Sequence, residues 1–527
     1  MKSLPGDALR PSLRADYIEE PDLVFGHQKE EKDPRIGLKY HGPFHYSSEA
    51  KPIPDKVRVG IIGNSVTIDL AKQVLIKLGS PIVSPESNKW LYPDFPGFLI
   101  DSPIRCEFTM SQHWEAVIRE TDIDASVGII DTNKRIAAAV NLFVDRVYSL
   151  SLEDDKPDVV ICALPSIVEE YCGVSERTRG AKRLAFTREE RRHAELSAQG
   201  QTFLNEWGIT MDRDPQVEEA VEREDEDDVD LDFHNALKGK VMEFGIPVQV
   251  LRESTARGFL SYGVPTVKRT QEPATVAWNL STALYYKANG KPWRLAKLDQ
   301  DTCYVGISFF RNLLSPLGNV HTSMAQVFTH SGEGFVLRGS DVVVDEDNRE
   351  PHMTKNQITK LVEDALNRYK ARARREPRII TIHKSTQFSS EEREGIGDAI
   401  GSLEKNLVSI TTQHDIRIAR DGDYPVLRGT VIYLSDSQCL LFTTGYVPRI
   451  RTYPGPGIPR PLLVTHQGDS QLRTVCQDIM GLTKLNWNTT SFSTYLPITL
   501  EFSKKVGRVL SELPRDRPLQ HHYRFYM

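Results

Sequence analysis

The chain has 527 residues, of which 26% are charged and 39% hydrophobic. This is a globular composition, and the length exceeds what one compact core accommodates, so two or three domains are expected. No run approaches the roughly 18 apolar residues of a membrane span, and residues 1–22 lack the apolar core of a signal peptide. We therefore expect a cytoplasmic protein with no membrane partner.

The net charge of −6 is unevenly distributed along the chain. Glu218–Asp232 holds ten acids and one arginine, which gives this segment a net charge of −9. All other residues together therefore carry a net charge of +3. Charge therefore neither proposes nor excludes a nucleic-acid partner, because a positive channel can lie in a nearly neutral protein. For the charged insertion near 179–231 we keep two interpretations: a solvated loop, or an acidic mimic of nucleic acid that shields a basic channel.

The chain begins with a lead-in, residues 1–55, that is rich in Pro, Gly and charge, and we expect it to be extended. The apolar run Val57–Ile62 then predicts a strand, followed by a turn and a helix over 67–79. The turn Gly63–Ser65 lacks the GxGxxG fingerprint of a nucleotide-binding loop, which favours an ordinary connection over a phosphate loop. Asp158–Leu164 predicts a second strand, so this region indicates an α/β layer.

Three elements follow the insertion: a helix over Asp232–Phe244, a strand over Ile246–Leu251 and a helix over Thr275–Lys287. Beyond Cys303–Phe309, a predicted strand, further strands alternate with helices. Those strands and helices are expected at 332–339, 355–374, 378–383, 426–434, 439–445 and 500–513. Several strands with helices on their faces indicate a mixed sheet of the ribonuclease H type.

The usual signatures of enzyme chemistry are missing from the sequence. There is no GxSxG elbow and no GxxxxGK[ST] loop, which argues against a serine hydrolase and a P-loop enzyme. The six cysteines form no CxxC pair and have no nearby His at zinc-ligand spacing. We interpret them as reduced core thiols.

One group of polar residues has a spacing that suits phosphate. His234 and Lys238 are four residues apart and so project from one face of the helix, beside its apolar stripe. Gln249 follows eleven residues later, at what we expect to be the far end of the next strand. A lysine charge, a histidine donor and an amide donor together could hold a terminal phosphate. Each residue alone is more often an exposed polar group.

These motifs resemble the MID domain of Argonaute proteins. The resemblance rests on His-x3-Lys, the Gln in GIPVQ, and YYKANGKPW with Lys287, Asn289 and Lys291. CYVGISFF, RIITIHKSTQFSSEE and TKLNWNTTSFSTYLPITLEFSKKVG then look like successive segments of a PIWI domain. DPRIGLKYHGPF and YPDFPGF are similar to phrases of short prokaryotic Argonautes, which keep MID and PIWI alone. The match runs from about residue 17 to Met527.

The resemblance implies a Rossmann-like MID domain followed by a ribonuclease H-like PIWI domain. The expected boundaries are a lead-in at 1–55, MID at 56–300 and PIWI at 301–527. The resemblance also implies that the guide 5′-phosphate binds to four residues, with Mg²⁺ at the phosphate and the chain terminus at Met527 nearby. Those four residues are His234, Lys238, Gln249 and Lys287, with Lys291 left open beside Lys287.

The resemblance implies that the PIWI domain does not cut. Slicing relatives hold two metal ions with carboxylates, because Mg²⁺ prefers hard oxygen ligands. Ser308 stands where they have the first Asp, and Lys384 where they have the second. Glu333 is a candidate third acid with no motif around it. We therefore expect no catalytic residue, no catalytic metal and no enzymatic activity in this chain.

An inactive sensor needs an effector, and the resemblance implies one. Short Argonautes of this kind pair with an APAZ-domain protein carrying a TIR, a sirtuin-like or a nuclease domain. We expect a heterodimer, with a higher oligomer on activation, that binds an RNA guide and single-stranded DNA target and depletes NAD in invaded prokaryotic cells. Two alternatives stay open: a guide-free structural partner, and an active nuclease using the acids Asp341, Asp345, Glu346 and Asp347.

Two further groups of residues each have an ordinary interpretation, which is structural, and a second one, which is contact with nucleic acid. The basic segment Asn367–Arg378 is either a solvated helix face or a phosphate contact. Four aromatic residues near the proposed pocket could stack on a guide base, although their helical spacing favours the core. They are Trp278, Tyr285, Tyr286 and Trp293.

Overall fold

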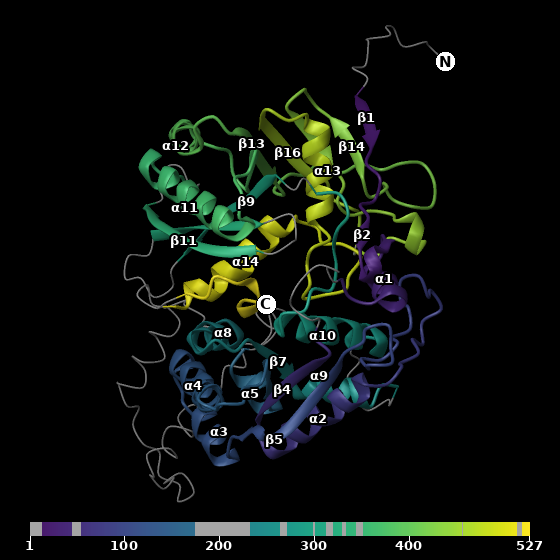
Figure 1. The fold of residues 1–527 in the computed structure, drawn as a ribbon, viewed down its shortest axis with the longest axis vertical. Coiled ribbons are helices and arrows are strands. Elements are labelled where there is room, and N and C mark those ends of the chain that lie inside the picture. The colour runs from purple at the N-terminus through teal and green to yellow at the C-terminus, as the bar shows by residue number, and fades with distance from the viewer. Residues whose placement is uncertain are drawn as a thin grey trace, which may run out of the picture.

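The structure, a computed structural model, describes most of the chain. The described residues are 13–44, 54–173, 232–263, 271–298, 301–311, 320–328, 334–343, 351–455, 457–513 and 519–527. They form two α/β layers that lie one above the other in Figure 1.

The first layer is built on a four-stranded parallel sheet in the order β5-β4-β6-β7. Its strands are β4 (Lys56–Gly63), β5 (Glu107–Val117), β6 (Val159–Leu164) and β7 (Val248–Arg252). Every residue of β6 is buried, as expected of a central parallel strand covered on both faces. The sheet is therefore doubly wound, which confirms the Rossmann-like prediction.

Helices cover both faces of this sheet. One face packs on α2 (Ser65–Leu78), α9 (Glu253–Leu260) and α10 (Pro273–Lys287). The other face packs on α3 (Glu120–Val127), α4 (Thr132–Ser151), α5 (Ser166–Tyr171) and α8 (Phe233–Val241). The turn at Gly63–Ser65 is an ordinary connection, since the Asn64 side chain accepts the Thr67 N–H and caps α2.

The second layer is a mixed nine-stranded sheet in the order β1-β14-β15-β16-β13-β12-β9-β10-β11. Its later strands are β9 (Thr302–Arg311), β10 (Val320–Phe328), β11 (Gly334–Val343), β12 (Ile379–Lys384), β13 (Glu404–Thr411), β14 (Thr430–Tyr433), β15 (Gln438–Leu441) and β16 (Leu462–Gly468). An antiparallel β9-β10-β11 unit lies beside β12 and β13, which run parallel to β9. This arrangement confirms the ribonuclease H-type prediction.

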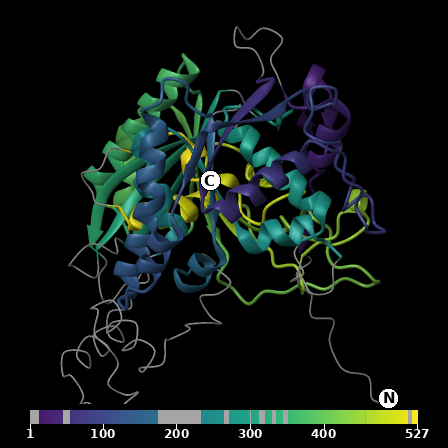
Figure 2. The ribbon, with the colours of Figure 1, turned by 90° about the horizontal axis from the view of Figure 1, so that it is seen from below.

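The faces of the nine-stranded sheet are also covered by helices. α11 (Lys355–Ala373) and α12 (Ser390–Ile400) pack on one face, and α13 (Leu472–Leu482) and α14 (Ile498–Ser511) pack on the other. The last residues run from α14 back between the two layers, and both views place the C-terminus at the centre (Figures 1 and 2).

The described part of the lead-in is more ordered than the expected extended segment. β1 (Arg14–Tyr17) extends the nine-stranded sheet, while β2 (Leu23–Val24) pairs with β3 (Glu30–Glu31) and β8 (Arg294–Leu295). α1 (Pro34–His41) begins where the Asp33 carboxylate accepts two backbone N–H groups. The expectation of an extended chain was therefore wrong here, because capping and packing outweigh the Pro and Gly content.

Most other elements lie where the sequence predicts them. The predicted helix Asp232–Phe244 is α8 followed by a 3₁₀ turn at Met242–Phe244. All six cysteines are buried and free, as predicted. Within the described ranges, every helix is too short or too polar to cross a membrane.

The contact between α14 and β9 gives a stability prediction. A Cβ atom at Gly306 would lie 2.0 Å from the Thr499 carbonyl oxygen, and that backbone cannot move aside. Gly306→Ala should lower the free energy of unfolding by about 1–3 kcal/mol, the usual cost of overpacking. Gly397→Ala is the matched control, since its Cβ meets nothing within 4 Å in helix α12. Thermal unfolding should show a lower midpoint for the first variant and an unchanged or higher one for the second; equal midpoints would contradict the close packing.

Candidate functional site

Helix α8 positions two of the predicted phosphate ligands. The Asp232 carboxylate accepts the N–H groups of His234 and Asn235 and starts the helix. The stripe of Phe233, Leu237 and Val241 is buried against the sheet. Lys238 is only 6% exposed, whereas His234 is half-buried. Lys238 therefore lies deeper than the expected place beside the stripe.

Gln249 and Lys287 meet across the edge of the parallel sheet. Gln249 is the second residue of β7, so its predicted place at the far end of the strand was wrong. Its Oε1 accepts a hydrogen bond of 2.5 Å from Nζ of Lys287, while its own Nε2 donates to the Val250 carbonyl. Lys287 ends α10 and is 1% exposed. Lys287 therefore contacts Gln249 directly.

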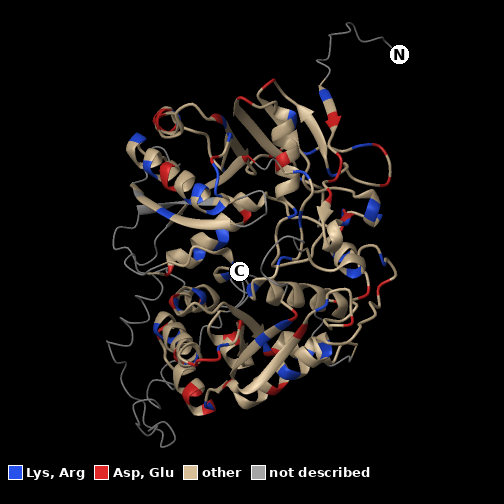
Figure 3. Cartoon of the chain, in the orientation of Figure 1, with Lys and Arg blue, Asp and Glu red and all other residues tan. Residues whose placement is uncertain are grey.

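The chain terminus lies at the same place. Nζ of Lys238 donates to the Tyr526 carbonyl at 3.1 Å, and Met527 is buried. The structure thus brings the last residues against α8, as the sequence analysis expected. The elements around the C-terminus carry Lys and Arg on both sides of it (Figure 3).

The electrostatics of this cluster are those of crowded cations. The pKa of His234 is held well below its usual value by partial burial and by the charges of Lys238, Lys287, Arg252 and Lys505. Burial and the charges of Lys287 and Lys505 lower the pKa of Lys238 strongly, and burial lowers the pKa of Lys287 to about 7. His234 is therefore neutral near pH 7 and can donate or accept one hydrogen bond.

The two buried lysines lack a neutralising partner of their own. Among the described residues, neither Lys238 nor Lys287 forms an ion pair with a carboxylate; each instead donates to a neutral oxygen. A buried charge without a counter-charge costs several kcal/mol. An anion placed among these groups would remove that cost, and a phosphate carries enough acceptor oxygens for all of them.

Two cations of this cluster were missed by sequence reasoning. Lys505 comes from α14 of the second layer, and Arg252 ends β7. Lys505 is paired only at 3.7 Å with Glu501 one helical turn away, and Arg252 lies 3.8 Å from Glu169. Lys505 could be recognised only in the fold, since it is 267 positions from Lys238 and no local pattern joins them, whereas Arg252 is three residues from Gln249.

The expected replacements of slicer acids lie on neighbouring parallel strands, Lys384 at the end of β12 and Ser308 within β9. Lys384 pairs in register with Ile307, one residue before Ser308. Nζ of Lys384 lies 2.8 Å from both carboxylate oxygens of Glu392, and both side chains are 1% exposed. Glu392 belongs to the capping box of α12, so this lysine neutralises a fixed acid.

Ser308 and Lys384 do not point the same way. Ile307 packs with the α11 and α12 face, so by strand alternation Ser308 lies on the α14 face with Phe310. On that face His383 bonds to the Thr499 hydroxyl at 2.7 Å. In the described part of the chain, no three His, Cys, Asp or Glu residues gather as a metal site would require.

Several sequence candidates fall outside the described residues. They are Glu333, Asp345, Glu346, Asp347 and the insertion near 179–231, together with the side chain of Asp341.

The basic segment and the aromatic residues agree with their ordinary interpretation. Lys370, Arg375 and Arg378 pair with Glu376, Asp301 and Glu404 at 2.8, 3.1 and 2.7 Å. These exposed pairs favour a solvated helix face. Trp278, Tyr285, Tyr286 and Trp293 are all buried in the core.

The arrangement of the two layers occurs in solved structures. Clostridium butyricum Argonaute bound to a guide DNA and a 19-mer target DNA matches with a TM-score of 0.57 and 13% identity, over 96% of this chain and 54% of that one. Drosophila Piwi matches with a TM-score of 0.57 and 12% identity, over 97% and 56%. A. aeolicus Argonaute matches with a TM-score of 0.51 and 15% identity, over 95% and 53%.

The chain thus spans about half the length of these structures. No protein-family model and no curated protein sequence matches it. The likeness in structure covers nearly all of the chain, and the chain therefore has an Argonaute-type fold.

Proposed function

We propose that this chain binds a nucleic-acid guide by its 5′-phosphate and uses the guide to recognise a complementary strand. The phosphate ligands in this proposal are His234, Lys238, Gln249 and Lys287. The observation that carries it is the pair of buried ammonium groups without a carboxylate partner, which an incoming phosphate would neutralise. The Argonaute-type fold supports the same function, since one matching structure holds a guide and a target.

Lys505 adds to the cluster from the second layer. A phosphate bound among these groups would therefore touch both layers of the molecule. If Mg²⁺ accompanies the phosphate, it would lie close to the last residues, which contact Lys238 at the Tyr526 carbonyl. The metal would add positive charge for the phosphate oxygens.

We further propose a guide of RNA, a target of single-stranded DNA, and recognition without cutting. The absence of cutting is supported by Ser308, which is a poor ligand, and by Lys384, which cannot ligate a metal ion. The pairing of Lys384 with Glu392 supports it further, because the Glu392 carboxylate is already bonded to that ammonium.

The biological role in this proposal is that of a sensor in prokaryotic immunity. It rests on the resemblance to short Argonautes, and the partner is an APAZ-domain protein with a TIR or sirtuin-like domain that depletes NAD. A nuclease effector is the alternative. Pairing of target with guide builds a stiff duplex whose shape can shift a partner interface between two states. Co-purification with an effector but without small nucleic acid would instead favour a guide-free structural partner.

Removing one buried ammonium tests the phosphate site. Lys238→Met should weaken binding of a 5′-phosphorylated RNA by about 10- to 100-fold, the value of one or two charge-assisted contacts. Binding of the same RNA with a 5′-hydroxyl should change little. The variant should not lose thermal stability without guide, because a buried uncompensated charge has been removed.

Lys240→Met is the matched control, on the same helix but bonded to Asn141 outside the cluster. Kd values from fluorescence anisotropy decide the outcome. An equal loss for both RNAs, or for both variants, would contradict the assignment.

The lowered pKa of Lys287 predicts how guide binding depends on pH. Without guide this pKa is about 7, and a bound phosphate would raise it, so binding takes up a proton above pH 7. The contribution of Lys287 is complete below about pH 7 and is lost as pH rises through the pKa of the bound state. The affinity ratio of 5′-phosphate to 5′-hydroxyl RNA should fall between pH 7 and 9, at most about tenfold per unit for each coupled proton.

Lys287→Met should flatten this pH profile. Phosphate itself titrates near pH 6, so it is mostly dianionic from about pH 7 upward, where the measurements are made. A ratio that is constant from pH 7 to 9 in the unsubstituted chain would be inconsistent with Lys287 as a phosphate ligand.

The absence of cutting has a direct test. Guide-loaded chain, given labelled complementary DNA with Mg²⁺ or Mn²⁺, should leave the target intact on a denaturing gel. Cleavage that Glu333→Gln abolishes would overturn this part of the proposal and support the alternative of a nuclease with atypical carboxylates.

A further inference from the structure

Two cysteines of the second layer are in direct contact. Cys439 lies on β15 and Cys476 on α13, and their sulfur atoms are 3.4 Å apart. One thiol therefore donates a weak hydrogen bond to the other. In the residues that the structure describes, the other four cysteines form no sulfur–sulfur contact. Both sulfurs belong to the core between α13 and the nine-stranded sheet, apart from the phosphate cluster on α8 and α10.

The contact is close to what a covalent bond between the sulfurs needs. A disulfide has a sulfur–sulfur distance of about 2.0 Å, so the two atoms must approach by about 1.4 Å. Partial rotation about the two Cα–Cβ bonds can cover that distance. The cysteines are 37 positions apart in the chain, so the bond would close a long loop that includes β16.

The burial of the pair decides how it can react. Both residues are 0% exposed, and the hydrogen bond with Cys439 together with burial raises the pKa of Cys476 well above its usual value. Buried thiols are ordinarily inert, because the thiolate is the reactive form. An oxidant must therefore be small and must act when the contact between β15 and α13 opens locally. The second sulfur then captures the oxidised sulfur before it reacts further.

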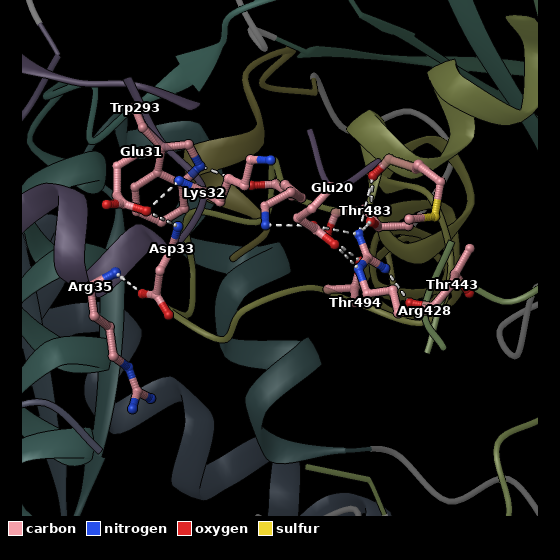
Figure 4. Close-up of polar contacts among 12 residues, drawn as sticks. Glu20, Glu31, Lys32, Asp33, Arg35, Trp293, Arg428, Thr443, Thr483 and Thr494 are labelled. Carbon is pink, nitrogen blue, oxygen red and sulfur yellow. Dashed lines mark hydrogen bonds and ion pairs between the residues drawn. The ribbon is translucent and has the colours of Figure 1, made fainter. Parts of the chain in front are cut away.

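Helix α13 is one of the elements that anchor the lead-in. Arg473 on α13 pairs with Asp16 of β1 at 2.8 Å. Just beyond the helix, the Thr483 hydroxyl accepts a hydrogen bond of 2.9 Å from Arg428, and the same guanidinium bonds both carboxylate oxygens of Glu20 (Figure 4). Strand β15 reaches the lead-in through the sheet, because it pairs with β14 and β14 pairs with β1. The two sulfurs thus join two of the elements through which the lead-in is held.

We propose that Cys439 and Cys476 are a redox-sensitive pair, which hydrogen peroxide converts to a disulfide that fixes α13 on β15. One thiolate attacks a peroxide oxygen and the O–O bond breaks, which gives a sulfenic acid and a hydroxide that leaves as water with the thiol proton. The second thiolate attacks the sulfenic sulfur, so the S–S bond forms, the S–O bond breaks and a second water leaves with the second thiol proton. Two electrons pass from the sulfurs to the peroxide, and a dithiol reductant reverses the reaction.

Peptide mapping of the full chain tests this pair. The reduced chain is incubated overnight with hydrogen peroxide, under conditions that fully oxidise glutathione, and is then alkylated in denaturant without reductant. Two of the six thiols should be lost, the mass should fall by two hydrogens, and one linked peptide should join Cys439 to Cys476. Dithiothreitol should restore both thiols. Cys303→Ala, which removes a buried thiol outside the pair, should still form the link, whereas Cys476→Ala should form no disulfide.

Hydrogen exchange measures the effect of the bond on the fold. After oxidation, exchange in peptides of α13 and β15 should slow by about tenfold or more, the lower end of what a disulfide contributes. Peptides of α11, on the opposite face of the sheet, should be unchanged. A disulfide that leaves the exchange of α13 as it was would overturn the fixing of this helix.

A link between other cysteines, or sulfinic acid on either residue without a link, would overturn the pair, as would six thiols that survive the peroxide. If Cys476→Ala fails to fold, the peptide map of the unsubstituted chain decides alone. The affinity of the reduced chain for 5′-phosphorylated RNA does not depend on this link. Failure here therefore leaves the proposed function standing, and loss of RNA binding leaves the pair standing.

Discussion

The cluster around α8 depends on two buried amino groups, those of Lys238 and Lys287, that form no ion pair with a described carboxylate. Water solvates an ammonium far better than a protein interior does, so folding must hold these groups in an unfavourable place. Their lowered pKa values express that cost. An anion placed among these groups would lower that cost, and a dianion would lower it more than a monoanion.

The same chain neutralises other lysines that are buried as deeply. Lys384 meets Glu392, and Lys484 meets Glu20. The charges of Lys384 and Lys484 are thus offset by a bonded carboxylate, whereas Asp232 acts on Lys238 only through its field and forms no ion pair with it. Among these four buried lysines, Lys238 and Lys287 are the two whose hydrogen bonds go to neutral oxygens.

The sequence predicted this fold where local patterns are strong. β6 is a continuous apolar run and α8 has apolar residues at helical spacing, so both follow from periodicity. β5 was missed because polar residues interrupt it and its surface is only partly buried. Helix α1 was missed although Asp33 and Pro34 are a capping signal, because the surrounding Pro and Gly suggested extended chain.

The candidate site was predicted only in part, because local sequence patterns contain some of its residues and not others. His234 and Lys238 share one helix, so their spacing was informative. The position of Gln249 depends on where β7 begins, which the sequence leaves open. Lys505 depends on the packing of α14 against α8, and no local pattern contains that information.

The placement of α14 and of the C-terminus gives the phosphate cluster a physical connection to the second sheet. α14 carries Lys505 toward the cluster, and its first turn packs at Thr499 against Gly306 of β9. The last residues join Lys238 at Tyr526 and bridge to β11 at His522. An anion that neutralises Lys238 would therefore change the charge beside α14 and the last residues, which pack directly on β9 and β11. Such contiguous packing is a physical route by which a change of charge at Lys238 can reach the nine-stranded sheet.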